Sequence, residues 1–236
     1  MRIAATGDLH FGKASPGIFQ PLLSQITTDA DVLLLAGDLT DYGTPDEARA
    51  LVKDLAAAVR IPIVAVLGNH DFEAGAEHEI HQIMVDHGVC MLDGDTCEVQ
   101  GVGFAGVKGF AGGFGRRALG PWGEPIVKQF VHEAVNETLK LESALARLRT
   151  ETKIVLLHYA PIEGTVEGEP REIFPFLGCS RLEEPLGRYG VSAVIHGHAH
   201  NGALEGRTST NIPVYNVAYP LMKKTTPGHP FRVLEF

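Results

Sequence analysis

The sequence predicts an α/β fold with a largely buried sheet, and two observations lead to this prediction. Short apolar runs alternate along the chain with segments in which apolar residues recur at helical spacing. The chain also has 236 residues, of which 44% are hydrophobic, and this is enough to build one sizeable core without disulfides. We therefore expect a single domain over residues 1–236.

Strands are expected at the short apolar runs. In chain order these are Arg2–Thr6, Val32–Ala36, Ile63–Leu67, Val102–Val107, Ile154–Leu157, Ala193–Ile195, Val214–Val217 and Arg232–Leu234.

Helices are expected between several of these runs. The clearest start lies at Thr44, which can cap a helix, followed by Pro45 at the first helical position and Glu47 to close a capping box. This helix should continue to about Val59. Two further helices are expected, over Glu77–His87 and Gln129–Arg149.

A Gly-rich stretch lies between Val102 and Gly123, and we expect a strand followed by a mobile loop there. Residues Gly101–Gly106 match the dinucleotide fingerprint as text, but they lie inside a strand-like run rather than between the first strand and a helix. Arg116 and Arg117 in the loop could reach a substrate phosphate or carboxylate. The alternative for both arginines is an ordinary solvated loop.

Composition narrows the classes of function. The three cysteines have no disulfide or zinc-ribbon spacing, which indicates reduced thiols. No leader and no membrane-spanning stretch is evident, so we expect a cytoplasmic protein without membrane attachment. A net charge of −9 argues against broad binding to nucleic acid.

Histidine, aspartate and asparagine gather just after the predicted strands. In open α/β sheets, the loops beyond the carboxyl ends of the strands converge on one crevice, so motifs far apart in sequence can meet there. The candidates, in chain order, are Asp8, His10, Asp38, Asn69, His70, Asp71, His158, His198 and His200.

Spacing and ligand chemistry favour metal binding over turn or capping roles. In extended chain, residues two apart project to the same side, so Asp8 and His10 can both face a metal, as can His198 and His200. Carboxylate and imidazole ligands suit divalent manganese, iron, cobalt or zinc. One ion cannot use seven of these nine residues as ligands, whereas two ions can.

These motifs, in this order and across nearly the whole chain, resemble those of the calcineurin-like metallophosphoesterase superfamily. The resemblance implies a β-sandwich of two mixed sheets flanked by α-helices. It also implies two divalent ions, which could be manganese, iron or zinc. The implied ligands are Asp8, His10 and His200 for the first ion, Asn69, His158 and His198 for the second, and Asp38 as the bridge between them.

The same resemblance implies that His70 contacts the scissile phosphate or the leaving group, and that Asp71 orients His70. A hydroxide shared by the two ions would attack phosphorus, while His70 could protonate the leaving oxygen. Three other histidines receive simpler interpretations. His196 is expected to have a structural or supporting role, and His78 and His81 to form a solvated helix face.

The expected activity is hydrolysis of a phosphodiester, a phosphomonoester or a nucleotide-like phosphoanhydride, with a small-molecule phosphodiester preferred. Substrate specificity comes from loops and does not follow from the metal ligands. The alternative is a non-catalytic interaction scaffold on the same fold, although no position of the motif set is missing. A homodimer through the Gly-rich loop or an edge strand is compatible with the sequence.

Overall fold

The computed structural model describes residues 1–236 and contains strands and helices in alternation. The strands are β1 (Arg2–Thr6), β2 (Val32–Ala36), β3 (Ile63–Val66), β4 (Cys90–Met91), β5 (Asp95–Val99), β6 (Val102–Gly106), β7 (Thr152–Leu156), β8 (Ala193–His196), β9 (Glu205–Arg207), β10 (Pro213–Asn216) and β11 (Arg232–Glu235). The α-helices are α1 (Gln20–Asp29), α2 (Pro45–Ala58), α3 (Glu77–Asp86), α4 (Pro125–Arg147), α5 (Phe174–Leu177) and α6 (Tyr219–Thr225).

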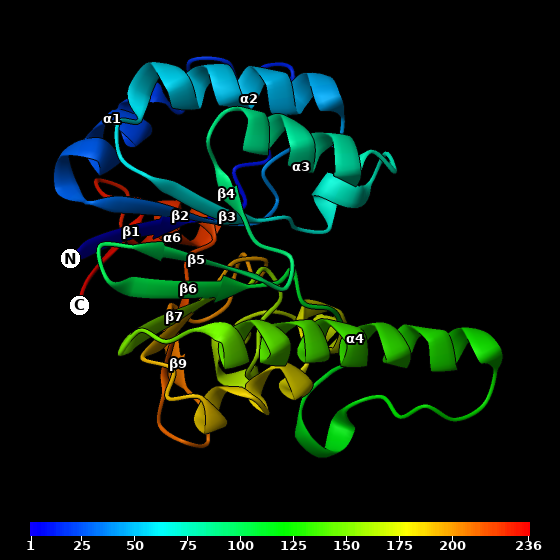
Figure 1. Cartoon of the computed structure of the whole chain (residues 1–236). Coiled ribbons are helices and arrows are strands. Elements are labelled where there is room, and N and C mark those ends of the chain that lie inside the picture. The colour runs from blue at the N-terminus through cyan, green and yellow to red at the C-terminus, as the bar shows by residue number, and fades with distance from the viewer.

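Two mixed sheets lie face to face, and helices cover their outer surfaces (Figure 1). The strand order is β11-β1-β2-β3-β4 in the first sheet and β5-β6-β7-β8-β10-β9 in the second. In Figure 1, α2 and α3 lie over the first sheet and α4 lies over the second. The predicted sandwich of two mixed sheets flanked by helices is therefore confirmed.

The first sheet separates two apolar clusters, as the side chains of β2 show. Leu33 and Leu35 belong to the apolar cluster shared with α1, α2 and α3, whereas Leu34 belongs to the cluster between the two sheets. Because successive side chains of a strand point to opposite faces, a strand buried on both faces is apolar throughout. This explains why β2 forms a continuous apolar run in the sequence.

Every predicted strand is present within two residues of its expected bounds. The capping box of α2 is also confirmed, because the Thr44 side chain accepts from the backbone N–H of Glu47 and the Glu47 carboxylate accepts from that of Thr44. Helix α4 begins at Pro125, four residues earlier than predicted. No disulfide joins Cys90, Cys97 and Cys179 in this structure.

Sequence patterns missed the short or polar elements. Strands β4 and β9 have two and three residues, and α1 begins without a side-chain cap or an acidic first turn. Strand β5 forms a hairpin with β6, in which Gln100 and Gly101 both have positive φ. The Gly-rich segment after β6 contains a short 3-10 helix, Gly115–Arg117. None of the helices combines the length and apolar character that crossing a bilayer requires.

Candidate metal centre

The loops that follow β1, β2, β3, β7 and β8 bring the predicted ligands together, with each sheet contributing part of the set. Within each of three groups, the potential ligand atoms all lie within 4.8 Å of one another. The groups are Asp8 with His10 and His200, His10 with Asp38 and His70, and Asp38 with His158 and His198.

Asp38 lies between the two halves of this cluster. Its Oδ2 is 3.8 Å from Nε2 of His10, and its Oδ1 is 3.4 Å from Nε2 of His158. On one side, Asp8 Oδ1 is 3.0 Å from Nε2 of His200. On the other, the amide oxygen of Asn69 is 2.9 Å from Nε2 of His158. A carboxylate in this position can contact a cation on either side.

The donor set fits divalent transition-metal ions. Asp8 and Asp38 are each only 1% exposed, so two carboxylates are buried beside several imidazoles and one amide oxygen. Buried charges are normally paired or bound to metals. Nε2 of His10 is a buried polar atom without a hydrogen-bond partner, and such an orphaned ligand atom is expected where an ion binds.

Several residues of the cluster have backbone conformations that are rare for side-chain-bearing residues. Asp8, His10, Asp38 and His198 have φ values of 57°, 44°, 47° and 70°, which side-chain-bearing residues rarely adopt. Backbone strain of this kind concentrates at functional sites. A Cβ on Gly68 would lie 2.2 Å from the backbone nitrogen and Oδ1 of Asp38, so only glycine permits this close approach.

In the metal-free protein, the histidines of the cluster differ in pKa. Burial lowers the pKa of His158, but the negative charge of Asp38 and its hydrogen bond outweigh burial and raise the pKa to about 9. Burial and the nearby charge of His158 together lower the pKa of His198 to about 4. Protons on some histidines therefore compensate the buried carboxylates in place of metal cations.

Metal loading is expected to release protons. His158 holds a proton at neutral pH and must lose it to bind a metal, because ligating histidine is neutral. Adding Mn²⁺ to weakly buffered protein near pH 7 should release about one proton or more per chain. Metal affinity should strengthen as the pH rises and level off above about 9. A pH-indicator titration checks both effects.

The His158→Gln variant is the matched control for this titration, because glutamine keeps a polar side chain but carries no titrating proton. It should release fewer protons on metal addition. Metal uptake by the unaltered chain without acidification would contradict the assignment of His158 as a ligand.

His70 and Asp71 differ from expectation in how they are held. Nδ1 of His70 lies 2.7 Å from the backbone oxygen of Asp41, which leaves Nε2 free to face the cluster. The Asp71 carboxylate instead accepts hydrogen bonds from the backbone N–H groups of Gly68, Leu39 and Thr40 and from the Thr40 hydroxyl. The Asp71 carboxylate therefore forms no hydrogen bond with His70, and its expected role in orienting His70 remains a prediction.

Asp71 connects two loops of the site through its hydrogen bonds. Its four donors lie in the loops after β2 and β3, which carry Asp38 and Asn69, so its buried carboxylate joins two parts of the site. The structure assigns the contact with His70 to Asp41, a residue that sequence reasoning missed. Asp41 also places Oδ1 3.7 Å from Nδ1 of His10.

Arg116 and Arg117 form no hydrogen bond or ion pair with the residues of the cluster. Both are exposed on the short helix Gly115–Arg117, neither forms an ion pair, and Arg117 lines a small cleft with Arg171. The backbone oxygen of Phe176 lies 3.1 Å from Nε2 of His198. The predicted contact of the two arginines with substrate remains a prediction.

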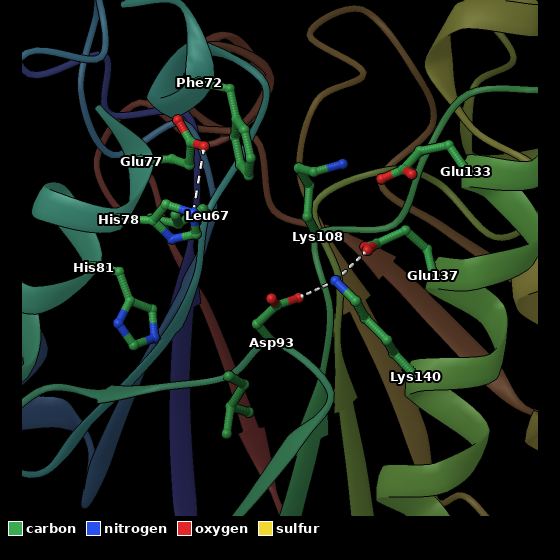
Figure 2. A pocket seen from close by; sticks show the side chains of 11 residues that line it. Leu67, Phe72, Glu77, His78, His81, Asp93, Lys108, Glu133, Glu137 and Lys140 are labelled. Atoms are coloured by element: carbon green, nitrogen blue, oxygen red, sulfur yellow. Dashed lines mark hydrogen bonds and ion pairs between the residues drawn. The ribbon is translucent and has the colours of Figure 1, made fainter. Parts of the chain in front are cut away.

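The three other histidines lie outside the ligand groups. Both ring nitrogens of His196 have partners, Nδ1 with the Gly197 backbone oxygen at 2.7 Å and Nε2 with the Thr165 hydroxyl at 2.8 Å. This agrees with the supporting role expected for His196. His78 has a fully exposed side chain, in keeping with the predicted solvated face, while His81 is half-buried. Both line a cleft between α3 and α4 (Figure 2).

Residues 1–202 match the family model of the calcineurin-like phosphoesterases. The chain belongs to this family. Membership of this family agrees with the predicted class of enzyme, a metal-dependent phosphoric ester hydrolase.

Other comparisons agree with this assignment. Over 75 residues, this phosphoesterase is 33% identical to a probable cyclic nucleotide phosphodiesterase of Rhodococcus erythropolis (strain PR4 / NBRC 100887). The match covers 29% of this chain and 25% of that protein, so the chain matches only about a quarter of its relative's length.

Two solved structures share the fold. The phosphopantetheinyl hydrolase of Mycobacterium tuberculosis has 16% sequence identity and a TM-score of 0.69, with 98% of this chain and 95% of that chain covered. The protein TT1561 of Thermus thermophilus has 16% sequence identity and a TM-score of 0.56, with 94% of this chain and 90% of that chain covered.

Proposed function

We propose that this phosphoesterase binds two divalent transition-metal ions and hydrolyses a small-molecule phosphodiester. The observation that carries the proposal is the position of Asp38, whose two carboxylate oxygens face histidines on opposite sides. We assign Asp8, His10 and His200 to one ion, and Asn69, His158 and His198 to the other. Asp38 would contact both.

When bound, the two ions supply an activated water as nucleophile and stabilise the charge that develops on the phosphate. The chain provides the remaining functions. The backbone oxygen of Asp41 fixes the ring of His70, so its Nε2 can donate a proton to the leaving oxygen. Asp71 holds the loops after β2 and β3 together, which fixes Asp38 relative to Asn69.

A phosphodiester is preferred over a phosphomonoester or a phosphoanhydride for two reasons. The matched relative from Rhodococcus is named a probable cyclic nucleotide phosphodiesterase. In addition, no lysine or arginine forms an ion pair with Asp8 or Asp38, and a diester carries less negative charge than a monoester at neutral pH. Binding a diester therefore demands fewer compensating cations.

Hydrolysis of bis-p-nitrophenyl phosphate beside p-nitrophenyl phosphate tests this proposal. Metal-free protein should be inactive toward both, and Mn²⁺ should restore turnover with the diester preferred. Because the ions provide both nucleophile and charge stabilisation, chelation should lower the rate by about 10³-fold or more. Readdition of Mn²⁺, Fe²⁺ or Zn²⁺ in separate samples identifies the ion that supports the highest rate.

The outcomes separate the alternatives. A higher rate with the monoester would change the proposed substrate class but not the enzyme class. Stoichiometric binding of two ions without turnover of any ester would favour the non-catalytic scaffold. Turnover that survives removal of all metal would contradict the proposal.

A further inference from the structure

An aromatic groove opens directly beside the metal centre. Its volume is about 440 Å³, which lies within the range typical of small-molecule sites. We define the aromatic groove by the residues that line it and carry the argument, namely Asn69, Phe72, Lys108, Phe110, Phe130 and Tyr159.

The groove is connected to the proposed ligands at one end. Asn69 lines it and contacts His158, while Tyr159 packs against His198 with ring centroids 4.6 Å apart and ring planes tilted by 56°. A phosphate ester bound at the metal centre would therefore have one substituent directed into this groove. Substituents on the other side of phosphorus would face His70 or solvent.

Aromatic rings form the walls. Phe110 packs against Phe130 at 5.0 Å and against Tyr159 at 6.0 Å between ring centroids. Phe72 on the facing wall is 39% exposed and has no aromatic partner, although an apolar ring of this size is normally buried. An unpaired ring opposite a ring cluster is suited to stacking on a flat ligand.

Lys108 supplies the only cation of the groove. Its Nζ lies 5.3, 4.9 and 5.4 Å from the ring centroids of Phe72, Phe110 and Tyr159, and it donates to the Gly109 backbone oxygen. It forms no ion pair within 4.0 Å, although Glu133 also lines the groove. Figure 2 shows Phe72 and Lys108 on facing sides, with Glu133 beyond Lys108.

We propose that the aromatic groove binds a flat heteroaromatic group of the substrate, such as a nucleobase, and that Phe72 and Lys108 select it. This inference rests on the proposed phosphoesterase function. The rings provide stacking surfaces, and the polar edge of the heterocycle finds a donor in Lys108 and further partners in Gln129 and Glu133 on α4. A purely aliphatic substituent would use neither the stacking surfaces nor these polar groups.

The test compares two ligands that differ only in the base. These are the methylene phosphonate analogues of adenosine monophosphate and of ribose 5-phosphate, neither of which can be hydrolysed. Calorimetry on the Mn²⁺-loaded enzyme should show at least about tenfold tighter binding of the adenosine analogue, as expected for one stacked base. Equal affinities would overturn the inference.

Two variants test whether Phe72 and Lys108 cause this difference in affinity. Phe72→Ala and Lys108→Met should each reduce the affinity for the adenosine analogue severalfold and leave the ribose analogue unchanged. Because Phe72 is partly exposed, its truncation should preserve the fold, which metal content can verify. Trp122→Ala removes an aromatic ring that is 71% exposed and lies outside the groove, and it should change neither affinity.

Turnover of methyl p-nitrophenyl phosphate, measured separately, distinguishes failure of the groove assignment from failure of the proposed phosphoesterase function. An active enzyme that binds both analogues equally would contradict only the groove assignment. The groove assignment would also fail if the Phe72→Ala and Lys108→Met variants both kept the full preference for the base. An inactive enzyme that still prefers the adenosine analogue would contradict the proposed function alone.

Discussion

The Asp38→Asn variant is expected to lose metal-dependent hydrolysis by about 10³-fold or more, because two ions that supply several kcal/mol of stabilisation would no longer be held together. Asparagine preserves the shape of the side chain, and its amide oxygen can still accept the hydrogen bond that the His70 backbone donates to Asp38 at 2.8 Å. What is lost is the negative charge and one metal-binding oxygen.

This variant should also change the metal-free protein. The charge of Asp38 is the main factor that raises the pKa of His158, so the pKa of His158 should fall when that charge is removed. Metal addition would then release fewer protons. Metal content by mass spectrometry, turnover of a chromogenic diester and the proton titration together measure the three effects.

Asp95→Asn is the matched control, because Asp95 has a mostly exposed side chain on the edge strand β5 and belongs to none of the three groups of potential ligands. It should keep the metal content and the rate of the unaltered enzyme. If Asp38→Asn bound two ions and kept its rate, Asp38 could not be the shared ligand.

The parts of the fold that the sequence predicted are those in which burial determines residue type. Strand β2 is buried on both faces, so its apolar run is unambiguous. Strands β5 and β9 lie at edges of the second sheet, where half-exposed residues give no such run. Helix α1 has no side-chain cap, and its apolar residues Leu22, Leu23 and Ile26 cover too short a stretch to show a clear period.

The same distinction applies to the site. The expected ligands could be found because each directly follows a strand, and strand ends converge in this type of fold. The partner of His70 could not be found, because it is the backbone oxygen of Asp41, and any residue type supplies such an oxygen. Likewise, the exposed position of Arg116 and Arg117 depends on the path of a long loop, which residue spacing does not encode.

The His70→Ala variant is expected to lower the hydrolysis rate by about 10²–10⁴-fold for esters with an alkoxide leaving group, the magnitude typical of general acid catalysis. The effect should be much smaller for a p-nitrophenolate leaving group, which departs without protonation. Both rates are measured on one Mn²⁺-loaded preparation, with an alkyl p-nitrophenyl diester and a dialkyl diester as substrates. The exposed His132 on α4 provides the matched control, His132→Ala, which should change neither rate.

Metal content decides between two roles for His70, because this residue also lies within 4.8 Å of potential ligand atoms of His10 and Asp38. If His70 is the proton donor, His70→Ala should retain both ions and lose rate selectively with the poor leaving group. If it is a metal ligand, the variant should lose an ion and slow both substrates alike. An unchanged rate with the alkoxide leaving group would exclude both roles and leave the hydrogen bond to Asp41 as a structural contact only.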